Sequence, residues 1–280
     1  MTGYGLALVA IVLGAFYGLF IHPRLRRKRI RAREFPAVWR QQLSRDMALY
    51  RRLPPDVRRR LHQNTLLILD EVNFYGCADL EVTEARKVLI AAHAGLLVTG
   101  LSVDYYRRLQ AILVYPGAYR SAVEWQDGSI AGVSREDRLG ESWDTGRVIL
   151  GWDQLAREAA DPETTSNVLL HEFAHQLDQL DGDADGAPPL GSGAVAAHWE
   201  EVFSDAWERL QAEGHNGRGR HEQGVIDRYG ATSPAEFFAV VTEAFFLTPV
   251  RLRDAEPALY ECLERFYGLS PAGWPEARQT

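Results

Sequence analysis

The pentapeptide His171-Glu172-Phe173-Ala174-His175 constrains the fold of this 280-residue chain more than any other feature of its sequence. On an α-helix, residues four apart lie about 40° from each other around the axis, so both imidazoles can bind one metal ion. Glu172 lies about 100° from His171, near enough to reach a water molecule beside that metal. This arrangement is typical of zinc hydrolases whose glutamate is the general base. The pattern therefore requires a helix here.

The flanking residues predict that the pentapeptide lies inside such a helix. Asp161-Pro162-Glu163 is typical of a helix start, because it combines a capping side chain, a proline and an acid near the positive end of the helix dipole. Asp181-Gly182 is typical of a helix end. Between the two, apolar residues recur at helical spacing: Val168, Leu169, Phe173, Leu177 and Leu180.

A hydrolytic zinc ion needs three protein ligands and one open position, so a third ligand must come from elsewhere. A second apolar helix is predicted to begin at Ser233-Pro234. Its two acids, Glu236 and Glu243, are seven residues apart and therefore share one face. Glu236 also fits a capping box with the preceding serine, an alternative role that Glu243 does not have. Spacing alone leaves both acids open as ligands.

Other candidate ligands fit less well. Asp181 lies six residues after His175, where some zinc proteases have a third histidine, but Asp178 then replaces the glycine that turns the chain back toward the metal. The run from Asp181 to Gly186 imitates the start of a calcium-binding loop, yet Ser192 replaces its final glutamate, so we expect a surface turn. Three further histidines remain possible ligands: His198, His215 and His221.

Longer stretches of the chain are similar to one known family. The matching segments are His171 to Asp178, Glu141 to Trp143, Gly146 to Trp152, Val114 to Pro116 and Asp227 to Val240. Together they resemble the Mlc titration factor A family of zinc peptidases, a gluzincin group related to the catalytic domain of anthrax lethal factor. The similarity extends from about residue 36 to about residue 268.

The resemblance implies how the ligand set is completed. In the family pattern a tyrosine stands seven residues before the glutamate that binds zinc, and Tyr229 has this spacing to Glu236. Glu236 is therefore the expected third ligand beside His171 and His175. The hydroxyl of Tyr229 is expected to hydrogen-bond the oxyanion of a tetrahedral intermediate.

The resemblance also implies supporting residues, a cofactor and partners. Glu243 and Asp178 are expected behind the ligands, where Glu243 would orient an imidazole. One zinc ion per chain is expected, with peptides or proteins as substrates and aminopeptidase action on short peptides. Members of the family also capture a glucose-type transcriptional repressor. The alternative function is therefore a regulatory binding protein that sequesters such a repressor.

The first segment of the chain is long enough to cross a bilayer. Tyr4 to Ile21 is a run of 18 apolar or small residues without a charge. A cleaved signal peptide would have positive charge before this run, whereas seven Arg or Lys residues lie after it, between Arg24 and Arg33. The positive-inside rule then places the rest of the chain in the cytoplasm. We expect a single-pass plasma-membrane anchor (1–21), a basic juxtamembrane linker (22–35) suited to anionic lipid and a peptidase domain (36–280).

Charge and cysteine content restrict the function further. The net charge of −7 divides into +11 for His22 to Arg60 and −18 for the residues that follow. An acidic catalytic region argues against nucleic acid as a partner. Cys77 and Cys262 have no metal-type spacing and indicate no disulfide framework, which suits a reducing compartment.

The predicted fold is α+β, a mostly helical zincin-like domain with a small sheet, after one transmembrane helix. Strands are predicted at Leu109 to Tyr115, Gly128 to Val133 and Arg147 to Trp152, and the last of these is a candidate edge for an added peptide strand. Besides the two helices of the site, helices are predicted at Ala37 to Arg52, from the Pro54-Pro55 break to about Tyr75, at Glu84 to Val98, at Ala194 to Ala212 and near Ala255 to Tyr267.

Overall fold

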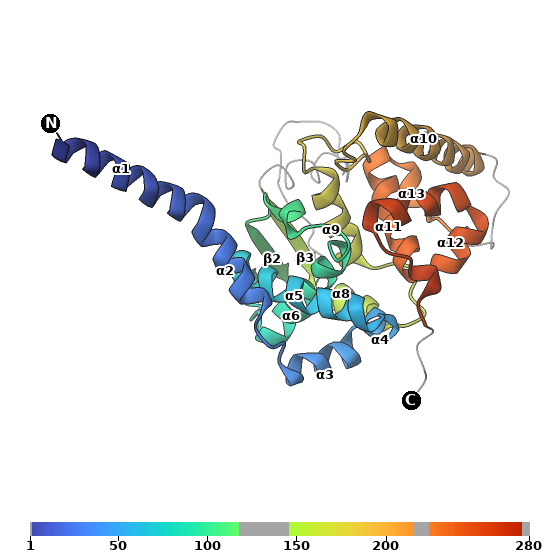
Figure 1. The fold of residues 1–280 in the computed structure, drawn as a ribbon. Coiled ribbons are helices and arrows are strands. Elements are labelled where there is room, and N and C mark those ends of the chain that lie inside the picture. The colour runs from blue at the N-terminus through green and yellow to red at the C-terminus, as the bar shows by residue number, and fades with distance from the viewer. Residues whose placement is uncertain (1, 118–145, 216–223, 276–280) are drawn as a thin grey trace, which may run out of the picture.

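The computed structural model describes residues 2–117, 146–215 and 224–275 (Figure 1). Helices predominate in these residues, and three short strands form one sheet. This confirms the prediction of a mostly helical chain with a small sheet. The predicted strand Gly128 to Val133 and the matching segment Glu141 to Trp143 lie outside the described residues.

The helices are divided about equally between the two halves of the chain. The N-terminal half contains α1 (Thr2–Phe16), a π-helical turn (Tyr17–Ile21), α2 (His22–Arg31), α3 (Ala37–Asp46), α4 (Ala48–Arg52), α5 (Pro55–Glu71) and α6 (Glu84–Leu97). The C-terminal half contains α8 (Trp152–Ala160), α9 (Val168–Asp178), α10 (Gly193–His215), α11 (Pro234–Leu247), α12 (Pro249–Ala255) and α13 (Pro257–Tyr267).

The sheet is parallel, with the order β1 (Asn73–Gly76), β2 (Ala111–Tyr115), β3 (Arg147–Gly151). Its register pairs Phe74 with Ile112 and Ile112 with Val148. Strands β2 and β3 confirm two predictions. Strand β1 was missed, because α5 was predicted to continue to about Tyr75. The chain instead becomes extended at Val72, where a β-branched residue and two aromatic residues favour a strand.

Two further predicted helices differ from the structure, and one helix was missed. The helix Ala37 to Arg52 is interrupted at Met47, whose extended backbone separates α3 from α4. Helix α8 was not predicted. Helix α9 begins at Val168 and not near Asp161, because the Asp161 carboxylate accepts from the backbone N–H of Glu163 and closes only a local turn.

Helices α10 and α11 lie where the sequence predicts them, and α11 (Pro234–Leu247) begins at the predicted Ser233-Pro234. The predicted last helix, near Ala255 to Tyr267, is α13, which begins at Pro257 after the non-helical Glu256, and α12 was not predicted. Aromatic rings from α10, α11 and α13 pack edge-on between these helices, and the two rings on α10 stack with their centroids 3.9 Å apart. The five residues are Trp199, Phe203, Phe237, Phe238 and Phe266.

Helix α9 lies at the centre of the domain (Figure 1). It packs against α6, α8, α11 and β3, and every residue from Phe173 to Asp178 is buried. Helix α11 is buried from Ala235 to Phe246. Polar side chains on these two helices therefore face other protein groups, and each needs a partner there.

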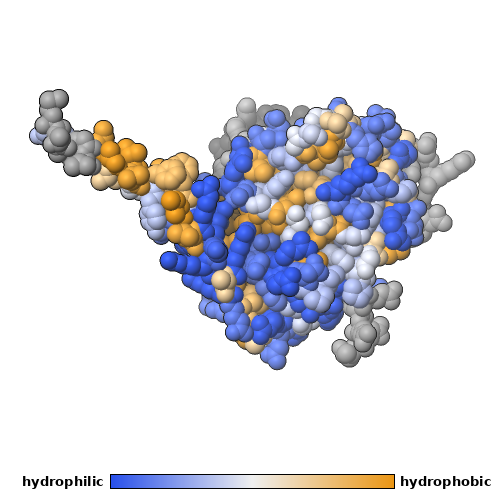
Figure 2. Space-filling model, in the orientation of Figure 1, coloured by the Kyte–Doolittle hydropathy of each residue, from blue (hydrophilic) through white to orange (hydrophobic). Residues whose placement is uncertain are grey.

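The N-terminal helix leaves the domain. Among the described residues one helix, Leu8–Arg31, is long and apolar enough to cross a membrane, and none of its apolar window is buried. Figure 2 shows it as a mostly hydrophobic rod next to a hydrophilic surface. Its basic end packs on the domain, where Arg26 pairs with Asp70 at 2.7 Å and Ile30 is buried.

Candidate metal centre

Three predicted ligands from two helices converge on one point. His171 and His175 come from α9, and Glu236 comes from the first turn of α11. The distance from His171 Nε2 to Glu236 Oε2 is 2.9 Å, and that from His175 Nε2 to His171 Nε2 is 3.2 Å. His175 Nε2 lies 3.6 Å from Glu236 Oε2. Within the described part of the chain, no other group of His, Cys, Asp or Glu side chains converges closely enough to hold a metal ion.

These separations fit a tetrahedral metal ion. Zn–N and Zn–O bonds of about 2.0–2.1 Å place neighbouring ligand atoms of a tetrahedron about 3.3 Å apart. The three measured separations, 2.9, 3.2 and 3.6 Å, lie around that value. Two imidazole nitrogens and one carboxylate oxygen are also the donor set of catalytic zinc sites, which keep a fourth position open. The residues present therefore fit the metal.

The start of α11 shows how Glu236 can have two roles. The Ser233 hydroxyl accepts from the backbone N–H of Glu236 at 3.2 Å, so half of the predicted capping box is present. The Glu236 carboxylate, however, faces the histidines. Ser233 and Pro234 thus set the start of the helix and leave the glutamate side chain for the site.

Glu243 supports the site from behind. Its Oε1 atom accepts from His171 Nδ1 at 2.8 Å, and its Oε2 atom accepts from the backbone N–H of Asn167. In neutral His171 the bond to Oε1 places the ring proton on Nδ1, so the lone pair that can bind a metal lies on Nε2. Glu236 and Glu243, seven residues apart, therefore contact different nitrogens of the His171 imidazole.

Two residues that the sequence analysis did not single out continue this arrangement. Asn167 caps α9, since its side-chain oxygen accepts from Leu170 N at 3.1 Å. Its amide nitrogen lies 3.5 Å from Nε2 of His93, a buried residue of α6 whose Nδ1 lies 2.9 Å from the carbonyl of Leu89. Burial lowers the pKa of His93 to about 4, so the ring is neutral and its Nε2 can accept. One polar residue in the apolar run Val88 to Leu97 was the available signal.

The electrostatics of the site favour a cation. Burial lowers the pKa of His171, but hydrogen bonds to Glu236 and Glu243 outweigh burial and raise this pKa to about 10. Burial favours the neutral form of Glu236, yet hydrogen bonds from His171 and His175 lower its pKa to about 2. Burial lowers the pKa of His175 to about 4. Without metal, a proton on His171 balances the carboxylates, and a metal ion would take over that positive charge.

The two predicted catalytic side chains lie beside this group. Glu172 is half-buried on α9, and its carboxylate is close enough to contribute to the raised pKa of His171. Tyr229 lies in a short 3-10 helix, Arg228–Ala231, whose N-cap is Asp227. Its ring centroid is 6.0 Å from that of His171. The structure thus brings both residues to the His-His-Glu group.

Asp178 contacts the loop that follows α9. It is fully buried at the end of α9, and its Oδ2 accepts from the backbone N–H of Gly186 at 3.0 Å. Gly186 has φ of +80°, and a Cβ there would lie 2.4 Å from the carbonyl oxygen of Pro234. Asp178 therefore links the end of one ligand helix to the start of the other through a loop.

Other predicted ligands lie apart from the group. His198 is half exposed and lies 3.9 Å from Glu201 on its own helix. The side chains of His215 and His221 lie outside the described residues. The acidic run Asp181 to Gly186 forms no convergent metal-binding group in the part of the chain that the structure describes.

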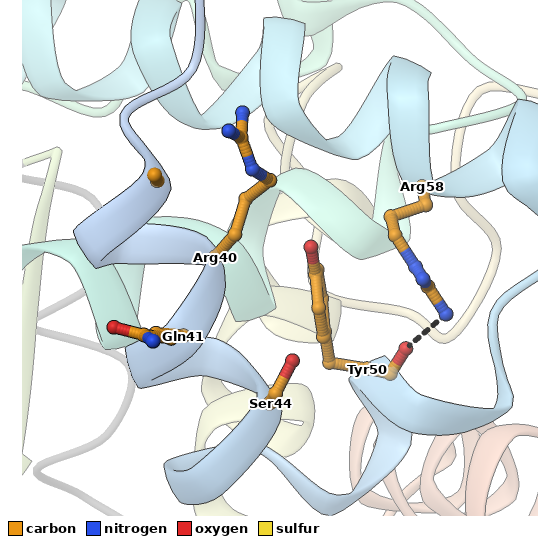
Figure 3. Close-up of a pocket in the computed structure, with 6 residues that line it drawn as sticks. Arg40, Gln41, Ser44, Tyr50 and Arg58 are labelled. Carbon is orange, nitrogen blue, oxygen red and sulfur yellow. Dashed lines mark hydrogen bonds between the residues drawn. The ribbon is translucent and has the colours of Figure 1, made fainter.

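A cavity of about 420 Å³ lies between α3, α4 and α5 (Figure 3). Arg58 points to the carbonyl oxygen of Tyr50 at 3.3 Å, and its guanidinium carbon lies 4.8 Å from the centre of the Tyr50 ring. None of the predicted site residues lines it; the lining residues are Ala37, Arg40, Gln41, Ser44, Tyr50 and Arg58. Convergent ligand atoms, and not this cavity, identify the candidate site.

Comparison with known proteins agrees with this site. Residues 22–268 match the family model of the glucose-regulated metallo-peptidase M90 group. The chain is 36% identical over 270 residues to the uncharacterized protein slr2042 of Synechocystis, covering 94% of this chain and 96% of that protein.

Proteins named Mlc titration factor A are also similar. The one from Pectobacterium atrosepticum is 32% identical over 195 residues, which are 69% of this chain and 72% of that protein. The one from Klebsiella pneumoniae is 30% identical over 234 residues, 83% of this chain and 86% of that protein.

Replacement of His93 tests the hydrogen-bond chain behind His171. We expect His93→Leu to weaken Zn²⁺ binding about 10- to 100-fold, because the Asn167 amide loses the acceptor that holds it in place. His93→Gln keeps an acceptor oxygen and should restore part of the affinity. The matched control is His62→Leu, which removes another neutral imidazole, one that is half-buried and stacked on Phe35. Metal titration with a competing chelator measures the affinities; equal losses in His93→Leu and His62→Leu would contradict the role of this chain.

Asp178 makes stability depend on pH. Burial raises the pKa of its carboxyl to about 7, well above that of the unfolded chain. The folded protein therefore retains a proton that the unfolded chain releases, and raising the pH favours unfolding until the folded group also ionises. Between pH 5 and pH 7 this group should lower the free energy of unfolding of the wild type by roughly 2 kcal/mol. Asp178→Asn lacks the carboxyl and should not show this decrease. Thermal and urea unfolding of both proteins measure the difference, and parallel pH profiles would refute it.

Proposed function

Because the chain belongs to the glucose-regulated metallo-peptidase M90 family, we propose that it is a zinc-dependent peptidase held at the cytoplasmic face of the plasma membrane by its N-terminal helix. The observation that carries the proposal is the convergence of His171, His175 and Glu236 at separations suited to one tetrahedral ion. Glu172 stands beside the two histidines on the same helix, where a general base is needed.

Each residue has a separate task in peptide hydrolysis. A zinc ion held by His171, His175 and Glu236 would lower the pKa of a water molecule and polarise the substrate carbonyl. Glu172 takes a proton from the attacking water and returns it to the leaving amine. Tyr229 donates its hydroxyl hydrogen to the oxygen that becomes negative in the transition state. Glu243 holds His171 with Nε2 facing the site.

The finer proposal is aminopeptidase action on short peptides. The residues that follow Arg60 have a net charge of −18, and such a region attracts the positively charged N-terminus of a peptide. The same charge disfavours nucleic acids as partners. We propose the anchor from the length and apolar character of Leu8–Arg31, and the cytoplasmic orientation from the basic residues that end it.

Two substitutions separate metal binding from hydrolysis. Glu172→Gln should retain Zn²⁺ with a similar affinity and lose at least about 100-fold in kcat/KM, because an amide cannot accept the proton of the attacking water. His171→Ala should lose both metal and activity. The measurements are zinc content by atomic absorption and cleavage of a peptide library, with a chelator as control. Undiminished cleavage by Glu172→Gln would refute the proposed base.

A second candidate function is regulatory binding. It is favoured by the name of several relatives, Mlc titration factor A, which indicates that those proteins titrate Mlc. In this chain the anchor would sequester a transcriptional repressor at the membrane.

The two functions predict different responses to Glu172→Gln and to zinc removal. If the chain acts only by binding, a repressor of this class should co-sediment equally with membranes carrying wild type, Glu172→Gln or chelator-treated protein. If hydrolysis is the function, peptide cleavage is lost in the last two, whether or not a repressor binds. Zinc-independent capture together with absent peptidase activity in the wild type would favour the binding role over the peptidase.

A further inference from the structure

A positively charged pocket lies where the N-terminal helix meets the domain. It has a volume of about 330 Å³ and is lined on one side by four basic residues of α2 and on the other by two polar residues at the start of a 3-10 helix (Val103–Tyr106). The lining residues are Arg24, Arg27, Lys28, Arg31, Ser102 and Asp104. None of them belongs to the metal centre.

The charge of this pocket is only partly balanced. Arg27 pairs with Glu71, at 2.7 and 2.9 Å, and with Asp104. Arg24, Lys28 and Arg31 form no ion pair with the acids of the described residues. They are separated by four and three positions and so lie on one face of the helix, where like charges repel. An anion between them would remove this repulsion.

The position of the pocket along the helix indicates where the anion comes from. The chain continues from α1 through the π-helical turn into α2 with helical backbone angles at both junctions. Arg24 lies three residues beyond Ile21, the end of the apolar run, and Lys28 seven beyond it, which is about 4.5 and 10 Å along the axis. The headgroup layer on each side of a bilayer is about 5–8 Å thick. If Tyr4 to Ile21 span the bilayer, the Arg24 end of the pocket lies within the headgroup layer, and Lys28 and Arg31 lie just beyond it on the side of the domain.

Helix α2 is held in one orientation on the domain. Arg26 pairs with Asp70, Arg27 pairs with Glu71, and Ile30 is 1% exposed. Both acids belong to the last turn of α5. Figure 1 shows α1 pointing away from the domain beyond this contact. The pocket is therefore a fixed feature at the base of the anchor.

We propose that this pocket binds the phosphate of one anionic membrane lipid, with Arg24, Lys28 and Arg31 as the cationic groups. The inference rests on the proposed membrane anchor but not on the proposed peptidase chemistry. Its consequence is that one lipid headgroup occupies the junction between the proposed anchor and the domain.

The test uses the full chain in detergent micelles, with native mass spectrometry after addition of phosphatidylglycerol, phosphatidylcholine or free glycerol phosphate. The wild type should bind one phosphatidylglycerol molecule at least about 10-fold more tightly than the variant Arg24→Gln/Lys28→Gln/Arg31→Gln. The matched control, Arg29→Gln/Arg33→Gln/Arg59→Gln, removes the same charge from residues outside the pocket and should bind as the wild type does.

Several outcomes would overturn the proposal. Equal loss in the two triple variants would indicate diffuse attraction without a pocket. Equal binding of both lipids, or of glycerol phosphate and phosphatidylglycerol, would exclude an anionic lipid as the specific ligand. Flotation of the wild type with liposomes tests the anchor separately, and zinc content with peptide cleavage tests the peptidase. A chain that floats and cleaves peptides but has no preferred lipid would refute the pocket alone.

Discussion

The interaction on which the site depends is the one made by the Glu243 carboxylate. One of its oxygens accepts from the ring of His171 and the other from the backbone N–H of Asn167, the cap of the same helix. A single side chain of α11 thereby holds both the start of α9 and the first ligand that α9 presents. Because both helices are buried here, a carboxylate without these two donors would be costly, so the pairing also fixes how the helices pack.

This dependence explains why so many polar groups are tolerated in an otherwise apolar core. Four residues form one series of hydrogen bonds, which begins at the carbonyl of Leu89 and ends at Nδ1 of His171, on the side of the ring opposite Glu236. In chain order they are His93, Asn167, His171 and Glu243. Such a series has few alternatives, since reversing one bond would leave a donor facing a donor. The result is an imidazole that is held at Nδ1 by Glu243, with Nε2 facing Glu236 and His175.

The sequence predicts the helices and strands that depend on local periodicity. It does not predict the boundaries and side-chain roles that tertiary contacts determine. The bounds of α11 follow from Ser233-Pro234 and its apolar run, and β2 follows from its β-branched residues. The start of α9 does not follow, because Asp161 and Asn167 are both good caps and only burial of Asn167 against Glu243 selects the second. Spacing placed Glu236 and Glu243 on one face but could not separate their roles. The structure distinguishes these roles, because Glu236 lies at Nε2 of His171 and Glu243 lies at Nδ1.

The supports of the site also extend to the N-terminal helix. Helix α6, which carries His93, packs along α5, and Asn64 of α5 donates to the carbonyls of Gly95 and Val98 at 3.2 Å each. The last turn of α5 in turn holds α2 through Asp70 and Glu71. The N-terminal helix and α9 are therefore connected by successive packed helices and not by a flexible linker. A chain built in this way would hold the candidate metal centre at one distance from the N-terminal helix and in one orientation relative to it.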